Sequence, residues 1–167
     1  ASGKIDTAFL VGLPLYVDGA LYNCAALVHQ GGVRGIVPKS LLTGEERRWF
    51  SSGADAARGE LLLGNEWIPF GPHLLFDAGE ATCAVAFGGE LIAPVPPVTE
   101  PLAAGAQIVL APGAASERAG RFPYLVESMK NLSARAACGI VYAGAGDGES
   151  TTDVVYGESL AVFENGD

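Results

Sequence analysis

Three consecutive stretches decide the fold class: the run Ile108-Val109-Leu110-Ala111, the stretch 124–138 and the run Ile140-Val141-Tyr142-Ala143. In residues 124–138 apolar side chains recur three and four positions apart, and most charged ones fall elsewhere, which predicts an amphipathic helix. Gly139 is expected to end that helix. The flanking apolar runs have the length of buried strands. Strand, helix and strand in this order indicate a layered α/β fold.

The segments before this unit predict further strands. Residues 7–17 and 21–28 are apolar runs separated by Asp18-Gly19, a tight-turn signal, and Gln30-Gly31-Gly32 predicts a second turn. A third strand over 33–37 should end at Pro38, because proline cannot donate to a strand ladder. Further strands are expected at 74–76 and 81–87.

The remaining segments are less regular. The polar stretch 43–68 is predicted to be a loop with one helical turn, and Thr99 is expected to cap a short helix that runs to Gly105. Residues 153–166 predict two short strands that meet at Gly157.

Composition limits the function. A chain of 167 residues, 49% of them hydrophobic, is expected to form one domain, residues 1–167. The net charge of −9 argues against nucleic-acid and anionic-membrane partners, because both attract basic surfaces. No apolar run reaches the roughly 18 residues that cross a bilayer, and the chain does not open with an export signal.

The three cysteines Cys24, Cys83 and Cys138 are far apart in apolar stretches, which predicts buried thiols in a reducing compartment, the cytoplasm. His29 and His73 have no Cys, His or Asp partners at ligand spacing, so no metal site is expected.

Lys39 is the first candidate functional residue. It directly follows the predicted strand that ends at Pro38. Residues just beyond strand ends line the ligand crevice of open α/β sheets, which gives this lysine a functional interpretation.

Three longer motifs point in one direction. Their sequences are Val11-Gly12-Leu13-Pro14-Leu15 leading to Leu21-Tyr22-Asn23-Cys24-Ala25, then Gly35-Ile36-Val37-Pro38-Lys39, and then Gly148-Glu149-Ser150-Thr151-Thr152-Asp153 after the Tyr142-Ala143 strand. Together they resemble the glutaminase domain of glutamine-dependent NAD synthetases, a branch of the nitrilase (carbon–nitrogen hydrolase) superfamily. The resemblance covers nearly the whole chain.

The resemblance implies a nitrilase-like αββα sandwich that is incomplete at both ends, since the family's first strand and helix have no counterpart in these residues. It implies no cofactor for this domain, because ATP and deamido-NAD belong to a separate synthetase domain. An uncovered sheet edge leads us to expect a homo-oligomer, or a synthetase domain or chain as partner.

In the family a cysteine thiolate attacks the side-chain amide of glutamine, a glutamate is the general base, and a lysine stabilises the oxyanion. The resemblance makes Lys39 that lysine. It places Glu45, in preference to Glu46, near the position of the family's second glutamate, the one that supports the lysine. Ser116 and Glu117 correspond to residues on the substrate side, and the general base would precede residue 1.

The family's nucleophile has no counterpart here. Aligned back from Pro94-Val95-Pro96-Pro97, the cysteine position falls on Gly88 and the next acid on Gly89. Cys83 lies within a predicted apolar strand, where a thiol is inert. The sequence therefore predicts a degenerate glutaminase domain that has lost glutamine hydrolysis.

Two alternatives remain open. The first is a divergent amidase that acts on another small amide through Lys39, Glu45 or Glu46 and a nucleophile such as Ser116. The second is a ligand-binding or oligomerisation module in which Gly88-Gly89 opens a pocket without turnover.

Overall fold

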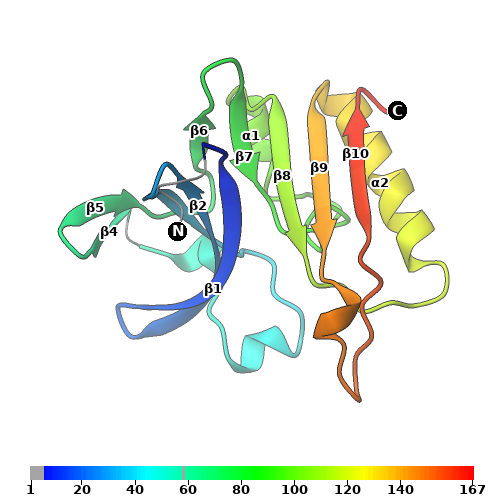
Figure 1. Ribbon diagram of the computed structural model, residues 1–167, viewed down its shortest axis with the longest axis horizontal. Coiled ribbons are helices and arrows are strands. Elements are labelled where there is room, and N and C mark those ends of the chain that lie inside the picture. Colours follow the sequence, from blue (N-terminus) through cyan, green and yellow to red (C-terminus); the bar gives the residue numbers. More distant parts are fainter. Residues whose placement is uncertain (1–5, 58) are drawn as a thin grey trace. The chain divides into compact units, whose positions relative to one another are not determined.

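The computed structural model describes residues 6–57 and 59–167, and the chain divides into two compact units, Ala1–Leu74 and Leu75–Asp167 (Figure 1). Among the described residues, the first unit contains a three-stranded and a two-stranded sheet, the second a five-stranded sheet, and each unit has its own buried apolar cluster. Within the described residues, no helix has both the length and the apolar character needed to cross a membrane.

The first unit is built on a three-stranded antiparallel sheet of β1 (Phe9–Val17), β2 (Ala20–His29) and β3 (Gly32–Pro38). Both connections are two-residue turns, Asp18-Gly19 and Gln30-Gly31. All four turn residues have positive φ, between 49° and 84°, as the tight turns that match the twist of antiparallel strands require. The three predicted strands and both predicted turns are confirmed.

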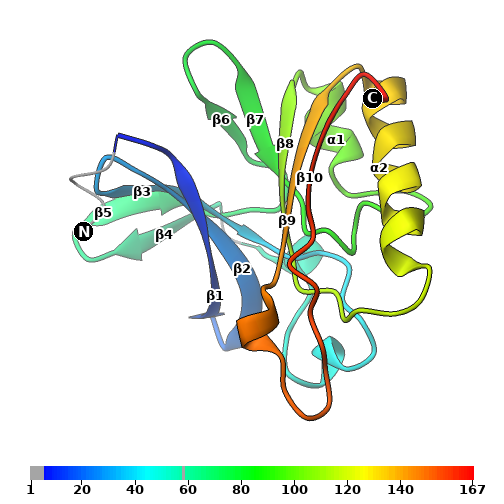
Figure 2. The same cartoon turned by 45° about the vertical axis from the view of Figure 1, so that its right-hand side comes forward.

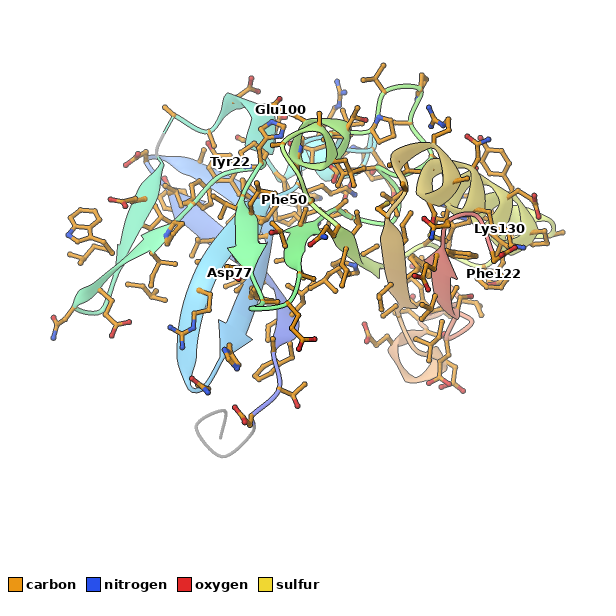
Figure 3. The ribbon with its side chains drawn as sticks, turned by 90° about the horizontal axis from the view of Figure 1, so that it is seen from above. Tyr22, Phe50, Asp77, Glu100, Phe122 and Lys130 are labelled. Atoms are coloured by element: carbon orange, nitrogen blue, oxygen red, sulfur yellow. The ribbon has the colours of Figure 1, made fainter. Side chains whose placement is uncertain are left out.

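The core of this unit lies on one face of that sheet. Tyr22 of β2, labelled in Figure 3, meets Phe70 edge to face, with ring centroids 5.7 Å apart and an interplanar angle of 74°. This arrangement suits the quadrupoles of two aromatic rings. Cys24, Ile36 and Ile68 complete the centre of the cluster.

The segment predicted to be mostly loop contains more structure than expected. It forms the 3-10 turns η2 (Glu46–Arg48) and η3 (Gly53–Asp55) and a hairpin of β4 (Glu60–Leu63) and β5 (Glu66–Pro69). The loop prediction is wrong for the hairpin. Leu62 pairs with Trp67 and both side chains are largely exposed, so apolar residues lie on both faces and no alternation marks the strands.

The second unit is a five-stranded mixed sheet in the order β10-β9-β8-β7-β6. Its strands are β6 (Leu75–Asp77), β7 (Thr82–Val85), β8 (Ile108–Gly113), β9 (Gly139–Gly144) and β10 (Leu160–Glu164). The central three strands are parallel, and each edge strand is antiparallel to its neighbour. The mixed α/β class is therefore confirmed.

Two helices, α1 (Thr99–Ala103) and α2 (Arg121–Ala136), cover the same face of this sheet (Figure 2). Leu125, Met129 and Leu132 of α2 pack on that face. Spaced three and four residues apart, they form the apolar stripe that the sequence pattern predicted. Burial of this stripe on the sheet holds the helix in place.

The C-terminal end of α2 and the N-terminal end of α1 differ from prediction. Helix α2 ends because Ala137 adopts a left-handed φ of 48°, so Gly139 does not end the helix but begins β9. Ser133 is fully buried, and its Oγ donates to the Cys138 carbonyl at 2.6 Å, which fixes the chain just after the helix. The residue preceding α1 is Val98, which makes no side-chain capping bond, so Thr99 does not cap this helix.

The C-terminal segment forms one strand, β10, so the prediction of two strands meeting at Gly157 is wrong. Backbone groups before Gly157 are used in loop contacts instead. The Val155 carbonyl accepts from the Glu117 N–H at 2.7 Å, and the Val154 carbonyl accepts from the Thr151 N–H at 2.7 Å.

Candidate functional site

Lys39 lies directly after β3, at the strand end where the sequence predicted it. Its N–H donates to the Asn23 carbonyl at 2.8 Å, which extends the β2–β3 ladder by one residue. Its carbonyl accepts from the Gly53 N–H, also at 2.8 Å. The backbone of Lys39 is therefore fixed on both sides.

The Lys39 side chain pairs with Glu46. The Nζ atom lies 2.6 Å from Oε1 and 2.8 Å from Oε2, and the two side chains are only 12% and 21% exposed. Asn23 Nδ2 adds a hydrogen bond to Oε1 at 3.3 Å. The acid that contacts Lys39 is thus Glu46, and not Glu45, which the resemblance favoured and whose side chain is exposed.

A reciprocal pair of hydrogen bonds turns Glu46 inward. The Glu46 N–H donates to Thr43 Oγ1 at 3.2 Å, and the Thr43 N–H donates to Glu46 Oε2 at 2.8 Å. This is the capping-box pattern, in which a Thr and a Glu three residues later satisfy each other's backbone donors at a helix start. The spacing Thr43-Gly44-Glu45-Glu46 is the sequence signal that identifies Glu46, and it was missed.

The environment of Glu46 favours its charged form. Burial acts to raise the pKa of this carboxyl, but the hydrogen bonds from Lys39 and Thr43 and the positive charge of Lys39 outweigh burial and lower the pKa below its ordinary value. Glu46 is therefore a carboxylate at neutral pH.

The loop behind Lys39 depends on a glycine. A Cβ at Gly53 would overlap the backbone carbonyl group of Pro38, so only glycine permits this close approach. Ser52 supports the same contact, since its Oγ donates to the Ser40 carbonyl at 2.7 Å and accepts from the Ala54 N–H.

In the second unit, Gly88 lies just beyond the carboxyl end of β7. Its N–H donates to the Pro112 carbonyl at 2.9 Å, which continues the β7–β8 pairing. Gly88 is buried and Gly89 is exposed. Carboxyl ends of parallel strands are where α/β sheets place ligand sites, so the predicted nucleophile position lies at a suitable edge.

The ring of Tyr142 fills the space above Gly88. A Cβ placed on Gly88 would lie 2.5 Å from Tyr142 Cε2, and one on Gly113 would lie 2.8 Å from the Tyr142 Oη and Cε2 atoms. Gly144 approaches the same hydroxyl. Tyr142 is 3% exposed, and burial raises the pKa of its hydroxyl; the charge of Arg121 lowers this pKa and the charge of Glu117 raises it, both by less than burial does. Three glycines thus form a slot that one aromatic ring occupies.

Ser116 and Glu117, the predicted substrate-side residues, lie in the loop between β8 and α2. Ser116 is half-buried and Glu117 is exposed. The Glu117 carboxylate lies beside Gly157, where a Cβ would come within 2.6 Å of its Oε2 atom. Lys39 and Glu46 belong to the first unit, and Gly88, Ser116, Glu117 and Tyr142 belong to the second.

The three cysteines are free and buried, as predicted. Burial raises the pKa of Cys24 to about 12 and also raises the pKa of Cys83 and of Cys138. Because the thiolate is the nucleophile, raised pKa values and burial make all three thiols poor nucleophiles. Across residues 6–57 and 59–167, no group of three or more His, Cys, Asp or Glu side chains is arranged to hold a metal ion.

Comparisons with solved structures define the fold. An amidase of the nitrilase superfamily from Nesterenkonia AN1 matches with a TM-score of 0.75 and 18% identity, over 99% of this chain and 56% of that one. A glutamine-dependent NAD(+) synthetase from Cytophaga hutchinsonii matches with a TM-score of 0.83 and 25% identity, over 96% of this chain and 26% of that one. The chain has the nitrilase-superfamily fold.

Sequence comparison gives the more particular relationship. No family model matches the chain. It is 35% identical over 172 residues to the glutamine-dependent NAD(+) synthetases of Mycobacterium bovis and Mycobacterium tuberculosis, and 34% identical over 173 residues to that of Mycobacterium leprae. Each alignment covers 99% of this chain, which spans about a quarter (25%) of the length of these curated relatives. The resemblance to the glutaminase domain of glutamine-dependent NAD synthetases is therefore confirmed.

Proposed function

We propose that this chain is a glutaminase-like domain of a glutamine-dependent NAD synthetase in which glutamine hydrolysis has been lost. The observation that carries the proposal is Gly88, which has no side chain to attack an amide and which the resemblance, aligned back from Pro94-Val95-Pro96-Pro97, assigns to the position of the family's cysteine nucleophile. The burial and raised pKa of Cys24, Cys83 and Cys138 support it, since none of these thiols is a suitable replacement.

The remaining groups support descent from an amide hydrolase. Lys39, which the resemblance assigns as the family's oxyanion lysine, directly follows a strand, and the Glu46 carboxylate pairs with it. In this proposal the pair holds the loop 43–48 onto the sheet, and the domain acts through packing. ATP and deamido-NAD are expected to bind a synthetase domain or chain, with this domain as its partner, in the cytoplasm and in a homo-oligomer.

The test is a direct assay for ammonia. Purified protein supplied with glutamine should release no ammonia above a blank, and a glutamine-analogue electrophile should label no cysteine. Glutamine turnover that disappears in Cys83→Ala would overturn the proposal. A relative bearing a cysteine at the position of Gly88 is the positive control.

The alternative of a divergent amidase is tested with small amides. A solved structure of the Nesterenkonia amidase contains butyramide, which makes short aliphatic amides a sensible first panel. Turnover that is lost in Ser116→Ala would favour that alternative. A ligand-induced rise in melting temperature without product would instead favour a binding module.

A further inference from the structure

The Tyr142 ring leaves no room for a side chain at position 88. A Cβ on Gly88 would lie 2.5 Å from Tyr142 Cε2 and 3.3 Å from Tyr142 Cδ2, and the first distance is too short for two carbon atoms. The φ of Gly88 is not in the left-handed region, so the backbone itself tolerates other residues. The obstacle is the aromatic ring alone.

The ring has little freedom to move aside. Tyr142 is 3% exposed and belongs to the main apolar cluster of its unit. Gly113 lies against the ring edge and hydroxyl, and Gly144 lies against the hydroxyl. Hydrogen bonds hold the backbone of both glycines in place. The Gly113 carbonyl accepts from the Ala145 N–H and the Gly144 N–H donates to the Ser159 carbonyl, both at 2.8 Å.

We infer that Tyr142 occupies the space of the missing nucleophile, so that positions 88 and 142 are sterically coupled and a cysteine at position 88 alone does not restore a usable thiol. The inference rests on the proposed function for the role of position 88. Tyr142 is then the residue that decides what the site can hold. Loss of the nucleophile and occupation of its space are thus two parts of one arrangement.

A double-mutant cycle tests the coupling. Gly88→Ala adds only the Cβ atom, and overpacking of this size should lower the melting temperature by about 3 to 10 °C in a chain of this length. The same substitution in a Tyr142→Leu background should lower it by less than about a third of that amount, because Cε2 is gone. Tyr142→Phe keeps Cε2 and should give no relief.

Gly89→Ala is the matched control, because a Cβ at Gly89 meets no atom within 4 Å. It should change the melting temperature by no more than about 1 °C in either background. If Gly88→Ala fails to fold alone but folds together with Tyr142→Leu, the coupling is supported. Equal losses in both backgrounds, or no loss in the wild-type background, would overturn it.

Thiol labelling gives a second measurement that does not depend on the Tyr142 variants folding. A cysteine introduced by Gly89→Cys should react promptly with a neutral disulfide reagent, whereas one introduced by Gly88→Cys should react at least tenfold more slowly or destabilise the protein. A stable Gly88→Cys variant that reacts as fast as Gly89→Cys would overturn the inference. None of these measurements uses glutamine, so glutamine hydrolysis by the wild type would refute the proposed function and leave the coupling standing.

Discussion

The Lys39 ammonium is held by both oxygens of the Glu46 carboxylate, at 2.6 and 2.8 Å. The contact joins the end of β3 to the start of η2, because Glu46 is the first residue of that turn and exchanges two hydrogen bonds with Thr43. One carboxylate therefore satisfies a side-chain cation and a backbone donor at once, and its replacement should affect both.

Glu46→Gln should lower the free energy of unfolding by about 1–3 kcal/mol, because it leaves the half-buried Lys39 ammonium without its counter-ion. Glu45→Gln is the matched control on an exposed neighbour and should stay within about 0.5 kcal/mol of wild type. Urea denaturation followed by circular dichroism measures both. Equal losses for the two variants would contradict the assignment of Glu46.

Acid should remove the stabilisation that the Glu46 carboxylate gives the folded protein. The pKa of Glu46 is lowered from an ordinary 4.5 in the folded protein, so between the two values the unfolded chain binds more protons than the folded one. The stabilisation is fully present above the ordinary pKa and is lost as the pH falls through the folded pKa. The stability difference between wild type and Glu46→Gln should therefore be constant near neutrality and shrink below 4.5. A difference that grew toward acid would contradict the lowered pKa.

Gly53→Ala should destabilise the protein by about 1–3 kcal/mol, because the added methyl group overlaps the Pro38 carbonyl and pushes the loop away from Lys39. Gly44→Ala is the control. A Cβ there meets no atom within 4 Å, and its φ is not left-handed, so its effect should be small. Chemical denaturation of the two variants compares them directly, and similar midpoints would refute the close approach.

The native thiols should resist labelling. At pH 8 a neutral disulfide reagent should modify none of the three cysteines of the folded protein rapidly and all three in denaturant, because burial limits access and raises their pKa values. Mass spectrometry of the labelled protein counts the adducts. Rapid single labelling of the native state, mapped to Cys83, would instead point to a reactive thiol.

Sequence patterns predicted the elements whose signals are local. The three strands of the first unit are joined by two-residue turns whose residues adopt positive φ, and α2 has an apolar stripe at helical spacing. The hairpin of β4 and β5 was missed because its exposed Leu62 and Trp67 remove the alternation that marks a strand. The hairpin is identified only by the pairing of β4 with β5 in the structure.

The candidate site was predictable only in part. The strand-end position of Lys39 followed from Pro38, and the capping-box spacing at Thr43 could have selected Glu46 over Glu45. The contact between Tyr142 and Gly88 could not be predicted, because it joins β9 to the segment just beyond β7, two strands that β8 separates, and depends on how one ring packs against three glycines. Such packing leaves no local pattern in a sequence.

The two turns at Asp18-Gly19 and Gln30-Gly31 also set the order in which this chain should fold. They make the β1–β2–β3 sheet a meander whose paired residues are close along the chain, so little loop-closure entropy is lost when it forms. The parallel pairs β7–β8 and β8–β9 must instead enclose the segments that contain α1 and α2. Pulse-labelling hydrogen exchange during refolding should find the amides of the meander protected before those of β8.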